Sequence, residues 1–272
     1  MKFKRRKEKL NVVGIIPARM ESSRFPGKPM VKIQGIPMVG HVYYRSKMCK
    51  SLNGVCVATC NQEIMDYIGS IGGTAIMTSN KHERASDRAA EALVKMEKIM
   101  GRKADIAVMI QGDEPMLIPR MVDEVVAPLR KDPSILISNL LGKIGSQEEF
   151  QSPNVVKVVV DKKNFALYFS REPIPSGKKC KQAYDKFKQI AIIPFRRDFL
   201  LKFNRLTPTP LEIVESVDMM RVLEHGFKVK MVPSSLDTYS VDTPGDLELV
   251  QRVMVQDPLL KTYAYERGCV PC

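Results

Sequence analysis

The sequence predicts an α/β fold, with a mostly parallel sheet covered by helices on both faces. Short apolar runs typical of buried strands alternate along the chain with longer stretches of helical periodicity. Such a βαβ rhythm favours a parallel sheet, because each strand returns to the sheet through a crossover helix. With 272 residues and 44% hydrophobic content, the chain can form one such domain with an elaboration, or two small domains.

The βαβ rhythm occupies the first half of the chain. Strands are predicted at 12–17, 54–59, 74–77, 105–110 and 135–139. The helices between them are predicted at 38–50, 61–71, 87–100 and 119–131. Ligands in such folds bind at the carboxyl ends of the strands, so we expect a site in the loops that follow them.

The second half departs from this rhythm at about residue 150. Further strands are predicted at 155–161, 166–170, 189–195 and 228–232, with a polar and basic excursion at 174–188. A helix is predicted from Thr209 to Gly226, because Thr209 and Glu212 form a capping box and Pro210 fits the first turn. A last helix is predicted at 243–255. We therefore expect one domain at 11–256, a basic extension at 1–10 and a C-terminal tail at 257–272.

Composition limits the classes of function. The net charge of +13 comes from Lys and Arg spread along the chain without a nucleic-acid-binding motif, so we expect no nucleic-acid partner. No apolar run is long enough to span a membrane, and the run at 12–16 is too short for a signal-peptide core. We therefore expect a cytoplasmic protein without a membrane partner. Cys269 and Cys272 have CxxC spacing but no second pair, so no metal is assigned to them.

The segment 16–29 has the composition of a phosphate-binding loop. It follows the first predicted strand and contains small residues, which let the backbone approach a phosphate. Arg19, Arg24 and Lys28 add three cations, and arginine can bind phosphate through two N–H groups at once. An ordinary surface loop with solvated cations is the alternative at this point.

Two further segments carry carboxylates. Asp113 lies in Gln111-Gly-Asp-Glu-Pro115, at the end of an apolar strand, where a carboxylate can hold Mg²⁺ against a nucleotide. Asp242, in the segment 239–246, can bring a second carboxylate to the same place. The alternatives are a turn for the first segment and a helix start for the second.

Together these motifs resemble those of the cytidylyltransferases that make CMP-activated acidic sugars. The resemblance is strongest to the group acting on 3-deoxy-manno-octulosonate (Kdo), and it runs from about residue 12 to 252. The segments that carry it are IPARMESSRFPGKPM, MTSNKHERASDRAAEA, QGDEP, NVVKVVVDKKNFALYFSREPIP and VDTPGDLELV.

The resemblance implies a nucleotidyltransferase (Rossmann-like) fold with a small acceptor-binding and dimerisation excursion at about 150–200, and a homodimer. It implies CMP transfer from CTP to a small acidic acceptor, with Mg²⁺ as cofactor and release of pyrophosphate. Catalytic roles fall on Arg19, Lys28 and Asp113, and the metal ligands are Asp113 and Asp242. The nucleotide-binding residues it implies are Pro17, Ala18, Arg19, Ser22, Arg24, Lys28, Arg84, Ala85, Ser86, Arg88 and Gln111.

The acceptor side departs from the family pattern. The residues expected to bind the acceptor are Arg171, Gln189, Ile193, Asp218 and Met219. The family usually has His and Tyr where this chain has Gln189 and Ile193, and Gln where it has Met219. Fewer polar groups should change the choice of acceptor, so a different acid such as another 2-keto sugar acid or a phosphonate is an alternative to Kdo.

Two other functions stay open at this point. Arg84-Ala85 stands where the family usually has Ser-Gly, near the expected cytosine site. A transferase that uses another triphosphate such as UTP is therefore one alternative. A nucleotide-binding regulator without turnover is the other.

Overall fold

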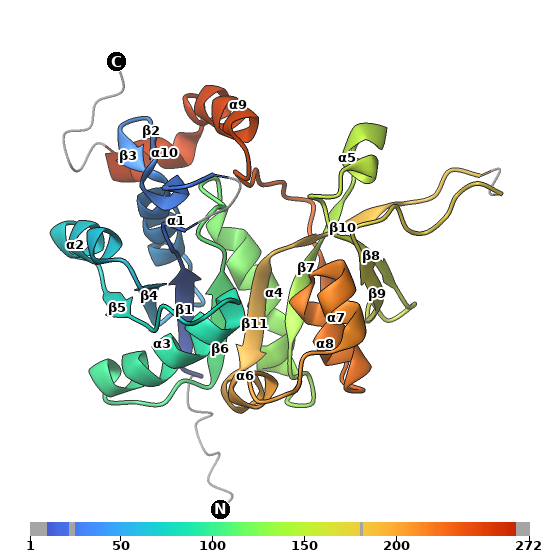
Figure 1. Ribbon diagram of the computed structural model, residues 1–272, viewed down its shortest axis with the longest axis horizontal. Helices are drawn as coiled ribbons and strands as arrows, with labels where there is room; N and C mark the ends of the chain where they lie inside the picture. The colour runs from blue at the N-terminus through green and yellow to red at the C-terminus, as the bar shows by residue number, and fades with distance from the viewer. Residues whose placement is uncertain (1–9, 22–24, 180–181, 265–272) are drawn as a thin grey trace, which may run out of the picture.

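The computed structural model describes residues 10–21, 25–179 and 182–264, and its first sheet has the predicted α/β architecture (Figure 1). The sheet has the strand order β11-β6-β1-β4-β5. Its strands are β1 (Val12–Pro17), β4 (Gly54–Thr59), β5 (Ala75–Met77), β6 (Ile106–Ile110) and β11 (Ile192–Arg196). All neighbouring strands are parallel except β11, which runs antiparallel to β6. The α/β fold class is therefore confirmed.

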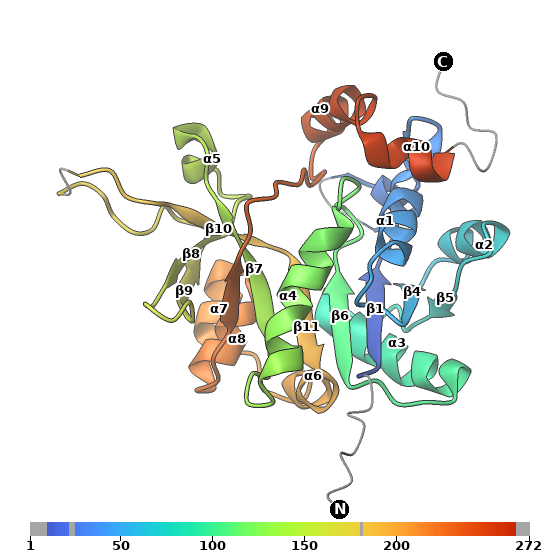
Figure 2. The same cartoon turned by 180° about the vertical axis from the view of Figure 1, so that it is seen from behind.

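Helices cover both faces of this sheet because the side chains of its buried strands alternate between the two faces. Val13 and Ile15 of β1 face α3 (Ala85–Met100) and α6 (Arg197–Phe203), which lie in front of the sheet in Figure 1. Val12 and Ile16 face α1 (Met38–Lys47) and α4 (Pro119–Lys131), which lie in front in Figure 2. On this second face α2 (Gln62–Ser70) packs beside β4 and β5.

A second sheet, with the order β12-β7-β10-β8-β9, stands beside the first (Figure 1). Its strands are β7 (Ser138–Lys143), β8 (Lys157–Val160), β9 (Ala166–Ser170), β10 (Phe187–Ile190) and β12 (Lys230–Pro233). Only β12 and β7 are parallel. An antiparallel bridge between Ile137 and Phe195 joins the two sheets next to β7 and β11.

The smaller elements lie around these sheets. They are η1 (Lys28–Met30), β2 (Lys32–Ile33), β3 (Ile36–Pro37), α5 (Gln147–Gln151), α7 (Pro210–Glu215), α8 (Asp218–Glu224), α9 (Pro244–Met254) and α10 (Pro258–Ala264). The hairpin β2–β3 packs with α9 and α10 in a third apolar cluster. No helix in the described part of the chain is long and apolar enough to cross a membrane.

Several predicted boundaries were wrong. The strand expected at 189–195 is two strands in different sheets, β10 and β11, separated by Ala191. The strand expected at 135–139 begins three residues later, as β7 at Ser138. The expected tail at 257–272 contains α10, whose Tyr263 is buried. Residues 1–9 and the Cys269–Cys272 segment lie outside the described residues.

The helix expected from Thr209 to Gly226 is also two helices. The predicted capping box of Thr209 and Glu212 is present at the start of α7. Ser216 then adopts a left-handed conformation, with φ 51°, which ends α7 before α8 begins. Local sequence gave no sign of this break, which is stabilised by tertiary contacts described below.

Candidate active site

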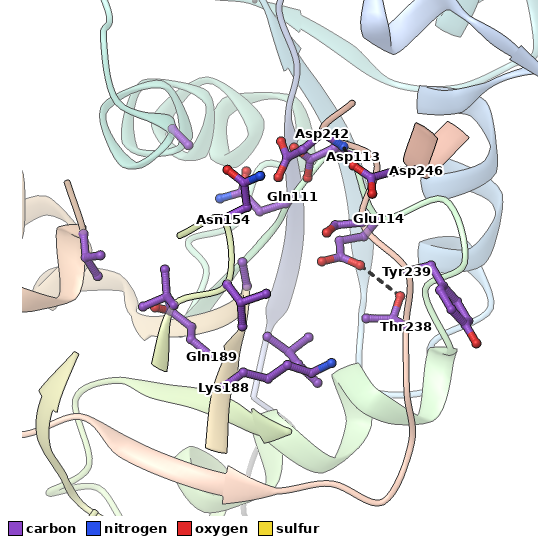
Figure 3. Close-up of a pocket in the computed structure, with 18 of the residues that line it drawn as sticks. Gln111, Asp113, Glu114, Asn154, Lys188, Gln189, Thr238, Tyr239, Asp242 and Asp246 are labelled. Carbon is purple, nitrogen blue, oxygen red and sulfur yellow. Dashed lines mark hydrogen bonds between the residues drawn. The ribbon is translucent and has the colours of Figure 1, made fainter. Parts of the chain in front are cut away.

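A large cleft, of about 1110 Å³, lies where the two sheets meet. Its walls come from the loops after β1 and β6, the start of α3, the strands β10 and β11, the α7–α8 turn and the segment before α9. The loops after β1 and β6 leave the carboxyl ends of parallel strands, which is where the sequence predicted a site. Figure 3 shows part of this cleft.

A backbone hydrogen bond connects the two ends of the loop after β1. Gly27 N donates to Met20 O at 3.0 Å, and Gly27 has a φ of 73°, which favours glycine. This turn starts η1 and brings Lys28 into the cleft, where Pro17, Ala18 and Arg19 also lie. Arg19 donates to His82 O at 3.5 Å, so the loop contacts the segment before α3. The predicted residues Ser22 and Arg24 lie outside the described residues.

Lys28 joins the two carboxylates that the sequence predicted as metal ligands. Its Nζ lies 2.8 Å from Asp113 Oδ2 and 3.3 Å from Asp242 Oδ1, although the two aspartates are far apart in the chain. Burial favours the neutral amine, but the nearby carboxylates outweigh that effect and raise the pKa of Lys28. This group therefore carries two negative charges around one fixed positive charge.

Backbone contacts hold both aspartates in place. Val241 N donates to Asp113 O at 2.9 Å, which ties the segment before α9 to the loop after β6. Asp246 caps α9 and accepts hydrogen bonds from the backbone N–H groups of Asp242 and Thr243, at 3.1 and 2.8 Å. Asp242 therefore sits on a capped helix start whose position is fixed relative to Asp113.

The donor chemistry of Asp113 and Asp242 fits Mg²⁺. Magnesium takes oxygen ligands, keeps several waters, and usually binds one or two carboxylates together with substrate phosphates. Within 10–21, 25–179 and 182–264, no three His, Cys, Asp or Glu side chains form a group that could hold a metal ion. Two protein carboxylates therefore suit a cation whose other ligands are triphosphate oxygens and water. They are too few for a cation that the protein alone would hold.

Gly112 allows the ends of β1 and β6 to approach each other. A Cβ at this position would lie 2.8 Å from Pro17 O, which is closer than real contacts allow. Glycine is therefore required between Gln111 and Asp113 for the two loops to share the cleft. In the Gln-Gly-Asp motif, the glycine therefore allows the close packing of the two loops, and the aspartate supplies the carboxylate.

Glu114 is a cleft residue that sequence reasoning did not predict as functional. Its carboxyl accepts a hydrogen bond from Thr238 Oγ1 at 2.9 Å, drawn in Figure 3. Burial, followed by the nearby Asp113, raises the pKa of Glu114 to about 8. Glu114 therefore links the loop after β6 to the segment that carries Asp242. In the sequence, only the position of Glu114 next to Asp113 indicated that it could lie in the cleft.

The start of α3 places Arg84, Ala85 and Arg88 in the cleft, as predicted. Arg88 is only 3% exposed, and one terminal nitrogen donates to Thr78 Oγ1 at 2.5 Å. The other terminal nitrogen is buried and has no hydrogen-bond partner in the described part of the chain. The predicted Ser86 is fully buried instead of lining the cleft, and its hydroxyl donates to Asp218 Oδ2 at 2.8 Å.

The predicted acceptor residues form one wall of the cleft. Ile193 and Met219 are buried and apolar, and Met109, which pairs with Ile193 across β6 and β11, extends the same wall. Gln189 also lines the cleft, and its Oε1 is buried without a hydrogen-bond partner among the described residues. This wall therefore offers much apolar surface and one amide oxygen that is free to accept.

Arg171 contacts the α7–α8 turn. Its guanidinium donates to the carbonyls of Glu215 at 2.9 Å and Ser216 at 3.3 Å, and to Pro153 O at 2.9 Å. The Glu215 carboxylate in turn accepts from Arg171 N at 2.9 Å and from Ser170 Oγ at 2.8 Å. Arg171, the residue after β9, thus satisfies the last carbonyl of α7 and that of Ser216, which stabilises the break between α7 and α8.

Other residues missed by sequence reasoning line the side of the cleft opposite α3. They are Lys143, Ser146, Glu148, Glu149, Asn154, Lys188, Thr238 and Tyr239. Lys188 Nζ pairs with Glu149 Oε1 at 2.5 Å, which attaches α5 to β10. Figure 3 shows Lys188 and Gln189 across the cavity from Asp113 and Asp242. The second sheet and the segment before α9 bring these residues to the cleft only through tertiary contacts.

Comparison with known proteins finds relatives that match most of this chain. The 3-deoxy-manno-octulosonate cytidylyltransferase of Geobacter metallireducens is 43% identical over 251 residues, covering 89% of this chain and 96% of the relative. That of Geotalea daltonii is 42% identical, covering 89% and 97%. A solved structure of CMP:2-keto-3-deoxy-manno-octonic acid synthetase complexed with CTP superposes with a TM-score of 0.83, at 38% identity and 90% and 99% coverage.

More distant proteins share the fold. A cytidylyltransferase from Leptospira borgpetersenii is 18% identical, with a TM-score of 0.60 over 96% of this chain and 97% of that one. A family model described as cytidylyltransferase matches residues 13–231. That match contains the loop after β1, the motif with Asp113 and the acceptor wall. The chain belongs to the cytidylyltransferase family.

Proposed function

We propose that this protein transfers CMP from CTP to a Kdo-like 2-keto sugar acid, with Mg²⁺ as cofactor and pyrophosphate as the second product. The observation that carries the proposal is the group formed by Lys28, Asp113 and Asp242, at the carboxyl ends of β1 and β6. The CTP complex of a relative with the same fold and the names of the curated relatives support the nucleotide and the acceptor.

In this reaction an acceptor hydroxyl oxygen attacks the α-phosphorus of CTP, and the bond to the oxygen that bridges to the β-phosphorus breaks. The residues mainly align the reactants and neutralise charge. Arg19 and Lys28, in the loop after β1, would contact the triphosphate, and Asp113 and Asp242 would hold the metal. Bound Mg²⁺ supplies positive charge to the phosphate oxygens.

Arg88 and the start of α3 form the nucleoside side of the proposed site. One terminal nitrogen of Arg88 is buried and has no partner among the described residues, so it is a donor that a ligand oxygen could satisfy. Such donors are costly to leave unpaired. Ala85 and Gln111 also line the cleft. We assign the cytosine and ribose to this side.

The acceptor wall supports a second candidate within the same reaction class. Met109, Ile193 and Met219 offer no hydrogen bonds to a polyol, whereas sites that recognise sugars rely on such bonds. An acidic acceptor whose recognition depends less on hydroxyl groups, such as another 2-keto sugar acid or a phosphonate, is therefore the second candidate.

We also propose a homodimer formed through the second sheet and its helices. Leu167 on β9, at the sheet edge, is 61% exposed, and Ile213 and Val214 on α7 are 64% and 79% exposed. The helix α8 connects these elements, because it contacts both α7 and β9. Exposed apolar side chains beside an open strand edge favour association with another chain.

The test is pyrophosphate release from CTP and Mg²⁺ with Kdo and a panel of other acids, repeated with ATP, GTP and UTP. Release that requires CTP, Kdo and Mg²⁺ is expected, with loss of at least about 100-fold in Asp113→Asn. Asp198→Asn is the matched control, because Asp198 is an exposed residue on α6 outside the cleft.

Other outcomes would replace parts of the proposal. Release with another acid alone would keep the mechanism and identify the altered acceptor. Release with UTP would exclude cytidine specificity. No release with any combination, while CTP still binds, would favour a nucleotide-binding regulator.

A further inference from the structure

Two arginines from opposite sides of the cleft converge on the α7–α8 turn. Arg171, at the end of β9, donates to Glu215 O at 2.9 Å and to Ser216 O at 3.3 Å. Arg84, the N-cap of α3, lies with its terminal nitrogen 3.3 Å from Asp218 Oδ1. Both arginines line the cleft, as do Ser216 and Asp218. The turn therefore brings together guanidinium groups from both halves of the molecule.

These contacts leave positive charge at this end of the cleft. Carbonyl oxygens accept the hydrogen bonds of the Arg171 guanidinium, but they do not neutralise its charge. Asp218 neutralises one arginine at most, and it also accepts the Ser86 hydroxyl at 2.8 Å. The nearby Arg221 and Glu212 form an ion pair, so their charges cancel. The Glu215 carboxylate also lies beside Arg171, but it accepts from Arg171 N, Ser170 Oγ and the Tyr168 hydroxyl. The Arg171 guanidinium itself donates to carbonyls and forms no ion pair within the described part of the chain.

Asp218 determines where the Arg84 side chain lies. The Asp218 side chain is 17% exposed and that of Arg84 is 31% exposed, so their attraction is only partly screened by water. The Ser86 hydroxyl donates to Asp218 Oδ2 and fixes the carboxylate, whose Oδ1 then orients the guanidinium. Without Asp218, Arg84 would be a long side chain free to leave the cleft wall.

We propose that Arg84 and Arg171 together bind the carboxylate of the acceptor, and that Asp218 is a positioning residue that holds Arg84 for this task. The inference rests on the proposed function, because it assumes an acceptor whose carboxylate lies beside the attacking hydroxyl. Arginine suits this role, because its planar group can donate two parallel hydrogen bonds to one carboxylate.

The contact with Asp218 also decides on which side of the cleft Arg84 acts. Asp218 belongs to α8, next to the turn that Arg171 contacts. Arg84 therefore acts on the acceptor side of the cleft, although it lies in the loop expected near cytosine.

The experiment measures KM for Kdo and KM for CTP separately, by pyrophosphate release with Mg²⁺, in Arg84→Ser, Arg84→Lys, Asp218→Asn and Arg84→Ser/Asp218→Asn. Arg84→Ser should raise KM for Kdo about tenfold or more and change KM for CTP less than about twofold. Arg84→Lys should show a smaller rise, because it keeps the charge but loses the planar fork.

The positioning role has its own signature. Asp218→Asn should also raise KM for Kdo, and the double variant should be no worse than Arg84→Ser, because both changes remove one interaction. Thermal melting checks the fold of each variant. The matched control is Arg120→Ser, since Arg120 is an exposed residue on α4 outside the cleft.

Several results would overturn the inference. A rise in KM for CTP with KM for Kdo unchanged would assign Arg84 to the nucleotide. Additive effects of Arg84→Ser and Asp218→Asn would exclude the positioning role. If the wild-type protein releases no pyrophosphate with Kdo, the proposed function fails, and calorimetric titration with Kdo alone then tests the arginine pair separately. Weaker Kdo binding by Arg84→Ser than by the wild type would support carboxylate binding by Arg84 and Arg171. Equal Kdo binding by the two proteins, or no Kdo binding by the wild type, would refute it.

Discussion

Arg221 and Glu212 form a buried ion pair with two parallel hydrogen bonds. The Arg221 Nε lies 2.6 Å from Glu212 Oε2, and its terminal nitrogen lies 2.5 Å from Oε1. The two side chains are 5% and 1% exposed. The pair joins α7 to α8 directly behind the turn that carries Asp218, so it supports the wall of the cleft from the protein interior.

Removing one charge of this pair should destabilise the protein. Glu212→Gln keeps the shape but leaves the Arg221 charge buried, and the expected loss in free energy of unfolding is about 3–5 kcal/mol. Urea denaturation measures it, with Glu248→Gln as control because Glu248 is exposed on α9. A loss below about 1 kcal/mol would show that the pair contributes little.

The close approach at Gly112 makes a second prediction. Gly112→Ala places a methyl group against Pro17 O, so the loops after β1 and β6 must separate. We expect a loss in free energy of unfolding of about 1–3 kcal/mol, together with reduced pyrophosphate release. Gly69→Ala is the matched control, because a Cβ there meets nothing within 4 Å. Equal behaviour of the two variants would refute the packing argument.

Lys28 should be required for turnover. Lys28→Met leaves the carboxylates of Asp113 and Asp242 without their shared cation and removes a charge from the proposed triphosphate site. We expect kcat/KM for CTP to fall by about 100-fold. Lys32→Met, a change at an exposed lysine on β2, should have little effect. Near-normal kinetics of Lys28→Met would remove Lys28 from the mechanism.

His41 should make stability depend on pH. Burial, together with the nearby Arg45, lowers the pKa of His41 from 6.5 to about 4, while the hydrogen bond to Ile33 O and the Asp257 carboxylate oppose this. Between pH 4 and 6.5 the unfolded chain binds more protons at His41 than the folded chain does. The contribution of His41 to the free energy of unfolding is therefore fully present above pH 6.5 and is lost as the pH falls toward 4. One pKa unit is worth about 1.4 kcal/mol, so the loss is on the order of 3 kcal/mol.

Denaturation curves between pH 4.5 and 7 measure this effect. His41→Gln should flatten the dependence, although it also changes the hydrogen bonds of His41 to Tyr263 and Ile33 O, both at 2.8 Å. The slope with pH, and not the stability at one pH, is therefore the quantity to compare. An unchanged slope would show that His41 is not the group responsible.

The homodimer proposal predicts a change in size. Val214→Glu places a charge on the exposed apolar surface of α7, and we expect sedimentation to show monomers where the wild type shows dimers. Val94→Glu is the control, because Val94 on α3 is 37% exposed and lies outside the cleft. A monomeric wild type, or a dimer that tolerates Val214→Glu, would refute the proposed surface.

The first half of the fold could be predicted because its signals are local. Buried strands such as β1 and β6 are short apolar runs, and the amphipathic helices between them have clear periodicity. The Thr209–Glu212 capping box was likewise predicted from adjacent residues and is present. The loops that follow β1 and β6 were found because they leave strands of a parallel sheet.

The remaining features depend on contacts between distant segments. The break in the predicted helix at Ser216 is stabilised by Arg171, the residue after β9, which donates to the carbonyls of Glu215 and Ser216. Glu114 gains its role from Thr238, which is 124 residues away. Residues of the second sheet such as Lys188 reach the cleft only through strand pairing. No local pattern in the sequence encodes these three contacts.

Ala191 is the only residue between β10 and β11, although these strands belong to different sheets. Gln189, Ala191 and Ile193 all line the cleft. A single residue thus carries the chain from one sheet to the other inside the cleft lining. The acceptor wall therefore belongs to both sheets, and its shape depends on how the Ile137–Phe195 bridge holds them together.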